Sequence, residues 1–257
     1  MRDESHQQQY QPPGVPPLTL SGERTLPDVP AENYWLRRHL AVYEWVRTRV
    51  GGLDVIDMAT GEGYGADELA RTAASVVGVD ASAEAFEHAR LRYTAPNLRF
   101  AHARVEEFAE PCDAIVCLQA IEHLSDPNAA LKHFRSFLGP NGVAYISTPN
   151  VLTLAPDGVR SDNPWHMHEY RPEEFEALLL AHFGSVDLFG LFHARKLAAH
   201  QFALENLSWD RVHEKLGMTK QFYDRFLPSL TTEDFVLHRM DSSFLGKALD
   251  VVAVCRP

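Results

Sequence analysis

The stretch Val55-Ile56-Asp57-Met58-Ala59-Thr60-Gly61-Glu62-Gly63-Tyr64-Gly65 is the starting point for the fold. It predicts a short buried strand that ends at an acid, then a glycine-rich turn, then a helix that begins near residue 66. Glycines let the backbone of such a turn approach a ligand closely, because no side chain is in the way and a positive φ is not strained. The N–H groups at the start of the following helix attract carboxylate or phosphate groups. Many nucleotide-binding folds contain a loop of this kind, so other residues must identify the ligand.

Downstream of this loop, apolar runs and helical patterns alternate, which predicts an α/β fold with a Rossmann-like, seven-stranded, mostly parallel sheet and helices on both faces. The expected strands are 54–58, 75–80, 98–101, 112–118, 143–148, 186–191 and 248–255. Residues 193–247 are expected to form a helical insert before the last strand. A Gln- and Pro-rich arm over residues 1–30, extended or partly disordered, precedes a single domain over 31–257.

Composition limits the classes of binding partner and the cellular compartment that we expect. The formal net charge is −11, from 24 basic and 35 acidic side chains. This balance argues against nucleic acid or an anionic membrane as a partner, because both favour basic proteins. No apolar run reaches the ~18 residues that a membrane span needs, and the first ten residues lack the apolar centre of a secretory signal. We therefore expect a cytoplasmic protein with no membrane span, and the sequence leaves its oligomeric state open.

Asp80, at the end of the second expected strand, narrows the ligand of the glycine loop. It follows Gly63 by seventeen residues, and an acid at this place can accept hydrogen bonds from two ribose hydroxyls. The ligand is then a nucleoside with an adjacent anionic group. NAD and S-adenosylmethionine both fit that description.

Five motifs decide between the two cofactors, because together they resemble the class I S-adenosylmethionine-dependent methyltransferases in order and spacing. They are Val55-Ile56-Asp57 with Gly61-Glu62-Gly63, Val77-Gly78-Val79-Asp80, Asp113-Ala114-Ile115-Val116, Ile121-Glu122-His123-Leu124, and Leu138-Gly139-Pro140-Asn141-Gly142. The resemblance covers about residues 50–190 and implies S-adenosylmethionine as the methyl donor and S-adenosylhomocysteine as the product.

The resemblance also implies which residues bind the cofactor. Asp57, Gly61 and Gly63 would hold its methionine end. Asp80 would bind the ribose, Ala81 and Val105 would lie beside the adenine, and Gln119 would follow the fourth strand next to the cofactor. Two residues depart from the family pattern: Ala59 stands where glycine is usual, and Arg104 stands where an acid often contacts adenine.

Basic residues on the first expected helix, over residues 31–50, have two interpretations. Arg37, Arg38 and His39 interrupt its apolar pattern. They are either solvated, or one of them reaches a ligand carboxylate across the mouth of the glycine loop. We take Arg38 as the candidate for the second role.

His123 and His166 are the candidate catalytic residues. Methyl transfer to a hydroxyl is an in-line displacement that requires alignment of the nucleophile and removal of its proton, and histidine suits the second task near pH 7. His123 follows the fourth strand, and His166 lies in a long loop from Pro149 to Tyr170 that is expected to cover the substrate. A metal site is the alternative, with Mg²⁺ at a sugar diol as its testable form. It would use Glu122, His123, Asp162, His166, His168 and Glu169, but their spacing does not favour it, and no metal ligand is assigned.

The segments outside the shared core suggest the acceptor. Gly22–Pro27, Glu32–His39 and the tail from Thr232 resemble actinobacterial glycan methyltransferases, including those of methylglucose lipopolysaccharide and of the mycofactocin oligosaccharide. Aromatic side chains offer flat faces for sugar rings, although core packing also explains most of them: Trp165, Tyr170, Trp209, Phe222 and Tyr223. We expect O-methylation of a glucose-type hydroxyl in polysaccharide biosynthesis. The alternatives are a methyltransferase of a non-sugar small molecule, a nicotinamide oxidoreductase, and a non-catalytic cofactor-binding protein.

Overall fold

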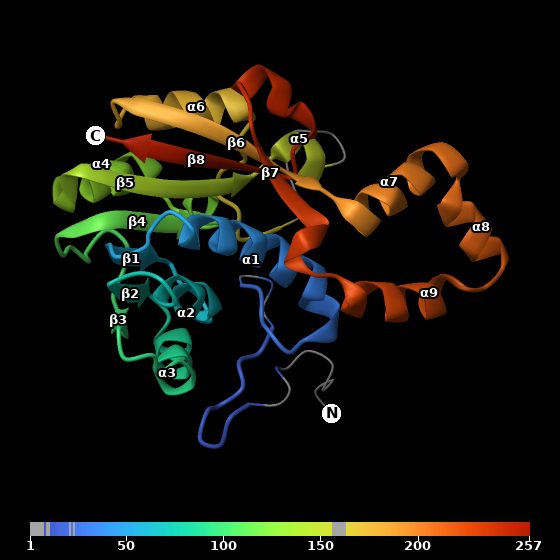
Figure 1. The fold of residues 1–257 in the computed structure, drawn as a ribbon, viewed down its shortest axis with the longest axis horizontal. Helices are drawn as coiled ribbons and strands as arrows, with labels where there is room; N and C mark the ends of the chain where they lie inside the picture. Colours follow the sequence, from blue (N-terminus) through green and yellow to red (C-terminus); the bar gives the residue numbers. More distant parts are fainter. Residues whose placement is uncertain (1–7, 9–10, 21, 23, 156–162) are drawn as a thin grey trace.

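A computed structural model describes residues 8, 11–20, 22, 24–155 and 163–257. Its centre is a mixed sheet of eight strands in the order β3-β2-β1-β4-β5-β8-β6-β7 (Figure 1). The strands are β1 (Asp54–Met58), β2 (Ser75–Asp80), β3 (Leu98–His102), β4 (Cys112–Leu118), β5 (Leu138–Pro149), β6 (Ser185–His193), β7 (Phe235–Arg239) and β8 (Asp250–Arg256). The first five strands pair in parallel, whereas β8 runs antiparallel to both β5 and β6.

The α/β fold is therefore confirmed, but the expected number of seven strands is wrong. The eighth strand, β7, pairs antiparallel with β6 at the edge of the sheet, from Phe189↔Arg239 to His193↔Phe235. It lies inside the segment expected to be helical. Its five residues, of which the last two are polar, are too few for a reliable periodic signal, and the pairing partners are 42 to 50 residues away in the chain.

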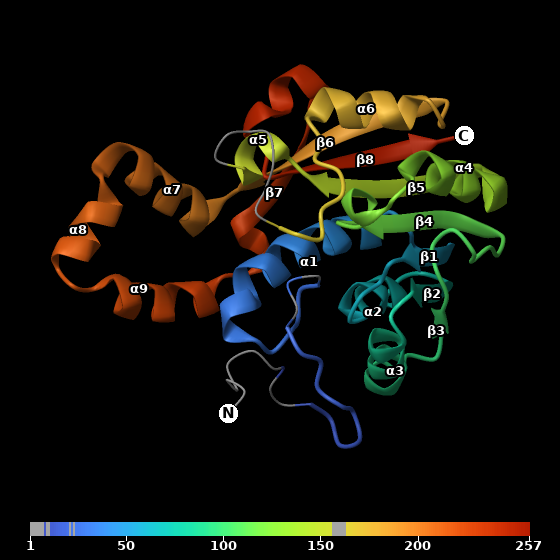
Figure 2. The ribbon, with the colours of Figure 1, turned by 180° about the vertical axis from the view of Figure 1, so that it is seen from behind.

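Helices cover both faces of the sheet because side chains alternate sides along each buried strand. Val55 packs with α1 (Asn33–Arg47) and α2 (Tyr64–Ala70), whereas its neighbour Ile56 packs with α4 (Pro127–Phe137) and α6 (Pro172–Leu180). Figure 2 shows α4 and α6 on one side of the sheet, with α3 (Ala83–Arg92) beside α2 near the β3 edge. The parallel strands are thus buried on both faces, as their continuous apolar runs require.

Three helices project from the body of the domain as a separate lobe (Figures 1 and 2). They are α7 (Arg195–Leu207), α8 (Trp209–Lys215) and α9 (Thr219–Phe226). Within the lobe, Phe222 stacks on His200 and His213, and Trp209 meets Phe222 edge-on. These aromatic side chains form the small core of the lobe. None of the described helices is long and apolar enough to cross a bilayer.

The described part of the N-terminal arm packs against α3 and the glycine loop. Leu18, Leu26 and Val29 form a small buried cluster. The two ring nitrogens of His88 lie 2.7 Å from the carbonyl oxygen of Pro16 and 2.8 Å from Oε1 of Glu62. Glu62, the middle residue of the glycine turn, therefore anchors the arm through its buried carboxylate.

Candidate functional site

A cavity of about 790 Å³ opens where β1, β2, β4 and β5 end. This is the edge of a parallel α/β sheet at which ligands bind, and the volume lies within the range of small-molecule sites. Of the residues expected to bind cofactor or substrate, seven line it: Gly61, Asp80, Ala81, Val105, Gln119, His123 and His166. The arm adds Gly22, Arg24 and Thr25 to the wall, and sequence reasoning gave these three no role.

The glycine turn is tied to the end of β2 through Asp80. The Gly61 N–H donates to Oδ2 of Asp80 at 2.8 Å, and the Ser82 N–H donates to Oδ1 at 2.8 Å. A carboxylate has about four acceptor positions, more than these two N–H groups use. The main chain of Gly61 has a φ of +61°, and Ala59 has a φ of +55°. The left-handed conformation of Ala59 explains why glycine is the more usual residue at its position.

Asp57 and Gly63 do not line the cavity; they support the turn that does. The Asp57 carboxylate is fully buried and accepts hydrogen bonds from the Thr60 hydroxyl at 2.6 Å and the Tyr43 hydroxyl at 3.2 Å. Burial raises the pKa of Asp57 to about 7. Gly63 has a φ of +102°, and a Cβ there would lie 2.9 Å from that of Ala89. Its glycine is needed for the contact of the turn with α3.

Arg38 also lies outside the cavity wall. Its side chain is 5% exposed, and its guanidinium donates to both carboxylate oxygens of Asp250, at 2.8 and 2.5 Å, and to the carbonyl of Leu249 at 2.7 Å. Asp250 itself lines the cavity. Arg38 therefore holds Asp250, a residue of the cavity wall. The expected contact of Arg38 with a ligand carboxylate does not fit this geometry.

At the β2 side of the cavity, Ala81 and Val105 line the region expected to hold adenine, together with Arg104 and Glu106. The Arg104 Nε lies 3.5 Å from a carboxylate oxygen of Glu106. An acidic side chain is thus present in this wall after all, two residues beyond the place where the family pattern has it.

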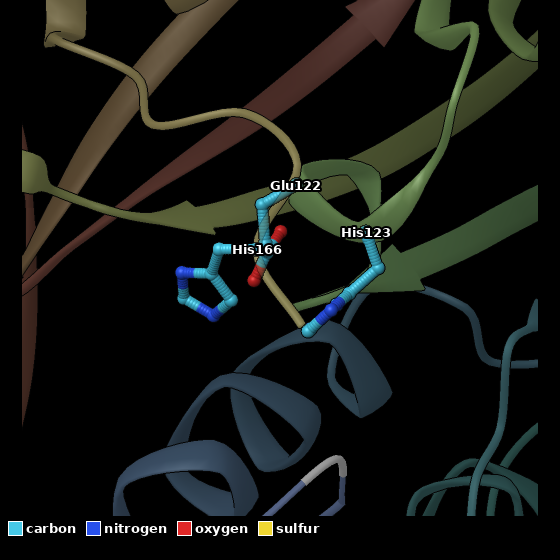
Figure 3. Close-up of side chains that lie close together, drawn as sticks. All are labelled: Glu122, His123 and His166. Atoms are coloured by element: carbon cyan, nitrogen blue, oxygen red, sulfur yellow. The ribbon is translucent and has the colours of Figure 1, made fainter. Parts of the chain in front are cut away.

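The β4–β5 side of the cavity carries three side chains that converge: Glu122, His123 and His166 (Figure 3). Glu122 and His123 lie in the short turn η3 (Ile121–His123) that follows β4. His166 comes from the long loop, which is held to that turn because the Met167 and His168 N–H groups donate to the Glu122 carbonyl at 2.9 and 3.0 Å. The structure thus brings together two candidates that lie 43 residues apart in the sequence.

Hydrogen bonds orient both histidines. The His123 Nδ1–H donates to the carbonyl of Trp165 at 2.9 Å, and the His166 Nδ1–H donates to Oε1 of Glu169 at 3.1 Å. A carbonyl oxygen can only accept, so in neutral His123 the ring lone pair is on Nε2. The same assignment holds for neutral His166 beside a carboxylate. Each imidazole is oriented as a base or a metal ligand requires.

Glu122 is the member of this group that the sequence suggested only as a possible metal ligand, with no catalytic or cofactor-binding role. Its side chain is 1% exposed, and burial raises the pKa of its carboxyl to about 8. Among the described residues, Oε2 of Glu122 has no hydrogen-bond partner. Of the other residues considered as metal ligands, Asp162 lies outside the described residues, and His168 and Glu169 do not join the group.

Comparison with known proteins gives the family. A family model described as a methyltransferase domain matches residues 31–199. A probable S-adenosylmethionine-dependent methyltransferase of Mycolicibacterium smegmatis is 40% identical over 245 residues, which are 92% of this chain and 94% of that protein. A probable S-adenosylmethionine-dependent methyltransferase of Mycobacterium tuberculosis is 40% identical over 184 residues, which are 70% of this chain and 66% of the relative. The chain thus spans just under two thirds of the M. tuberculosis relative.

More distant relatives include a ubiquinone biosynthesis O-methyltransferase of Albidiferax ferrireducens, 32% identical over 172 residues, 59% of this chain and 66% of that protein. Among solved structures, a methyltransferase of Thermotoga maritima described as a possible histamine N-methyltransferase superposes with a TM-score of 0.58 at 14% identity, over 87% of this chain and 91% of that one. The DhpI complex with S-adenosylhomocysteine superposes with a TM-score of 0.51 at 19% identity, over 89% and 87%. At these identities the solved structures show the fold alone.

Proposed function

Because this chain belongs to the methyltransferase domain family and is an S-adenosylmethionine-dependent methyltransferase, we propose that it transfers the methyl group to a hydroxyl of a sugar, a glucose unit of an oligo- or polysaccharide. The observation that carries the proposal is the convergence of His123 and His166 on the β4–β5 side of the cavity. Both present oriented imidazoles to the space left beside the cofactor.

This arrangement suits a hydroxyl acceptor. A sugar hydroxyl is a weak acid, and its oxygen becomes a good nucleophile only when a neighbouring group weakens or removes its O–H bond. The methyl group then passes in line from the cofactor sulfur to the oxygen, with inversion at the methyl carbon. Within the cofactor site, Gly61, Asp80, Ala81, Val105 and Gln119 are assigned to binding, and Asp57 and Gly63 to shaping the turn.

The resemblance of Gly22–Pro27 and Glu32–His39 to glycan methyltransferases supports the sugar class. The arm that carries the first of these segments contributes Arg24 and Thr25 to the cavity wall. A methyltransferase of a phenolic small molecule is the second candidate, since a relative is named a ubiquinone biosynthesis O-methyltransferase.

Mass spectrometry after incubation with S-adenosylmethionine separates the candidates. Glucose oligosaccharides should gain a methyl group, whereas a quinol-type phenol should remain unchanged. Methylation of the phenol alone would favour the second candidate. Cofactor binding with no turnover on either panel would favour a non-catalytic protein.

His166→Ala tests the acceptor side directly. Turnover of the glycan should fall by about 10²–10⁴-fold, the usual contribution of a proton-handling group, while the Kd for S-adenosylhomocysteine stays nearly unchanged. His182→Ala is the matched control, because the half-buried His182 side chain bonds Asn128 and neither residue lines the cavity. Unchanged turnover in His166→Ala would exclude a catalytic role for that residue.

A further inference from the structure

The group of Glu122, His123 and His166 has the composition of a metal site. Each residue offers one ligand atom, and these atoms all lie within 4.8 Å of one another. Two ligands bound to one tetrahedral zinc ion at 2.0–2.1 Å lie about 3.4 Å apart, so side-chain rotations that move the ligand atoms by about 1–1.5 Å would bring the set onto an ion. Figure 3 shows the three side chains pointing toward a common space.

The surroundings of the two imidazoles match those of metal-binding histidines. Such histidines donate their other ring N–H to a carboxylate or a backbone carbonyl, which fixes the tautomer and the ring orientation. His166 donates to the Glu169 carboxylate and His123 to the Trp165 carbonyl. Both classes of outer partner are therefore present, one for each ring.

The buried carboxylate of Glu122 is a second, independent indication of a cation site. This carboxylate is buried near the Thr148 hydroxyl, but neither Oε2 nor that hydroxyl has a partner in hydrogen-bond geometry among the described residues. A buried polar atom without a partner destabilises the fold, and a cation at Oε2 would offset that cost. The backbone bonds from Met167 and His168 to the Glu122 carbonyl hold the loop and the turn together before any ion binds.

The donor set selects the class of ion. Two imidazole nitrogens and one carboxylate oxygen suit divalent first-row transition ions such as Zn²⁺, whereas Mg²⁺ and Ca²⁺ prefer sets made only of oxygen. Three protein ligands also leave coordination positions open for a substrate oxygen. The sequence suggested Mg²⁺ as the testable form of a metal site, and this donor set favours a transition-metal ion instead.

We infer that Glu122, His123 and His166 form a binding site for a divalent transition-metal ion on the acceptor side of the cavity. What the ion does there rests on the proposed function. A sugar hydroxyl that coordinates the ion has a lowered pKa and releases its proton to water, and the resulting alkoxide attacks the methyl carbon as the C–S bond breaks. In this reaction the histidines act as ligands, since the same lone pair cannot also accept the proton.

The test uses the whole chain stripped with a chelator and then titrated with Zn²⁺ against a chromophoric competitor. Wild-type protein should bind one equivalent. Glu169→Ala, which removes an outer partner, should weaken binding by about 10–100-fold, and Glu122→Gln and His166→Ala should weaken it further. His182→Ala should bind like wild type. The Kd for S-adenosylhomocysteine, unchanged in each variant, shows that the fold is intact.

Absence of stoichiometric binding in wild type, or equal Zn²⁺ affinity in Glu122→Gln and His166→Ala, would overturn the site. Co²⁺ provides a second readout, because its visible absorption changes with the ligands and should differ between wild type and Glu122→Gln. Full glycan turnover by the stripped enzyme in chelator would overturn the role of the ion in the reaction. If the protein binds Zn²⁺ but methylates no glycan with any metal present, the proposed acceptor is wrong and the metal site is still supported.

Discussion

Arg38 and Asp250 form a two-point ion pair that joins the first helix to the start of the last strand across 212 residues of chain. Both side chains are buried, at 5% and 0% exposure. The pair holds Asp250 in the cavity wall, so it links the stability of the fold to the shape of the site.

Arg38→Met should destabilise the protein by about 3–5 kcal/mol, because it leaves the Asp250 carboxylate buried without its partner. Arg38→Met combined with Asp250→Leu should recover most of that loss, since an apolar pair needs no charge compensation. Urea unfolding of the two variants measures both effects. A loss below about 1 kcal/mol in the single variant would show that the pair does not stabilise the fold.

Gly65→Ala should be destabilising by about 1–3 kcal/mol, the usual effect of overpacking a core. A Cβ at this position would lie 2.1 Å from the Tyr43 ring, whose hydroxyl donates to Asp57. In a Tyr43→Leu background the same substitution should cost much less, because the obstructing ring atoms are gone. A double-mutant cycle by urea unfolding measures this coupling. Additive effects would contradict it.

The buried Asp57 should make stability depend on pH. Its pKa is raised by burial from 3.8 to about 7, so between these values the folded protein holds a proton that the unfolded chain has lost. The free energy of unfolding should therefore fall as pH rises, with Asp57 contributing about 1.4 kcal/mol per pH unit at most. The contribution of Asp57 should level off above pH 7, whereas that of buried Glu122, whose pKa is raised to about 8, continues to higher pH.

Urea unfolding between pH 6 and 8 checks this dependence. Asp57→Asn should flatten the decline. Thr60→Val removes a hydrogen bond that lowers the pKa of Asp57, so it should extend the decline to higher pH. Identical pH profiles for wild type and Asp57→Asn would show that another group is responsible.

Local patterns predicted most of the core correctly. The apolar runs before Asp57 and Asp80 identified neighbouring parallel strands, and the ends of such strands meet at one edge of the sheet, where Asp80 and Gln119 now line the same cavity. Asp80 and Gln119 each lie at or next to the end of a strand in the sequence. This is the information that periodicity and turn chemistry carry.

The missed features depend on contacts between distant parts of the chain. Nothing near Arg38 in the sequence indicates that it will meet Asp250. Glu122 and His166 could be suggested as ligands of one metal site, but no sequence spacing shows that they meet. Gly63 resembled a ligand-binding glycine, but its neighbour in space is Ala89 of the next helix. In each case tertiary packing determines the role of a residue whose local pattern allows several.

The aromatic residues considered for sugar stacking should divide into two groups. Trp209 contacts His213 and Phe222 inside the projecting lobe, whereas Trp165 is 46% exposed and precedes His166, a residue of the cavity wall, in the chain. Trp165→Ala should raise the glycan KM by about fivefold, equivalent to about 1 kcal/mol of aromatic contact, without changing cofactor affinity. Trp209→Ala should leave the glycan KM unchanged and lower the protection of α8 and α9 from hydrogen exchange. Steady-state kinetics and hydrogen exchange on both variants test this division, and a raised KM in Trp209→Ala alone would place the sugar on the lobe instead.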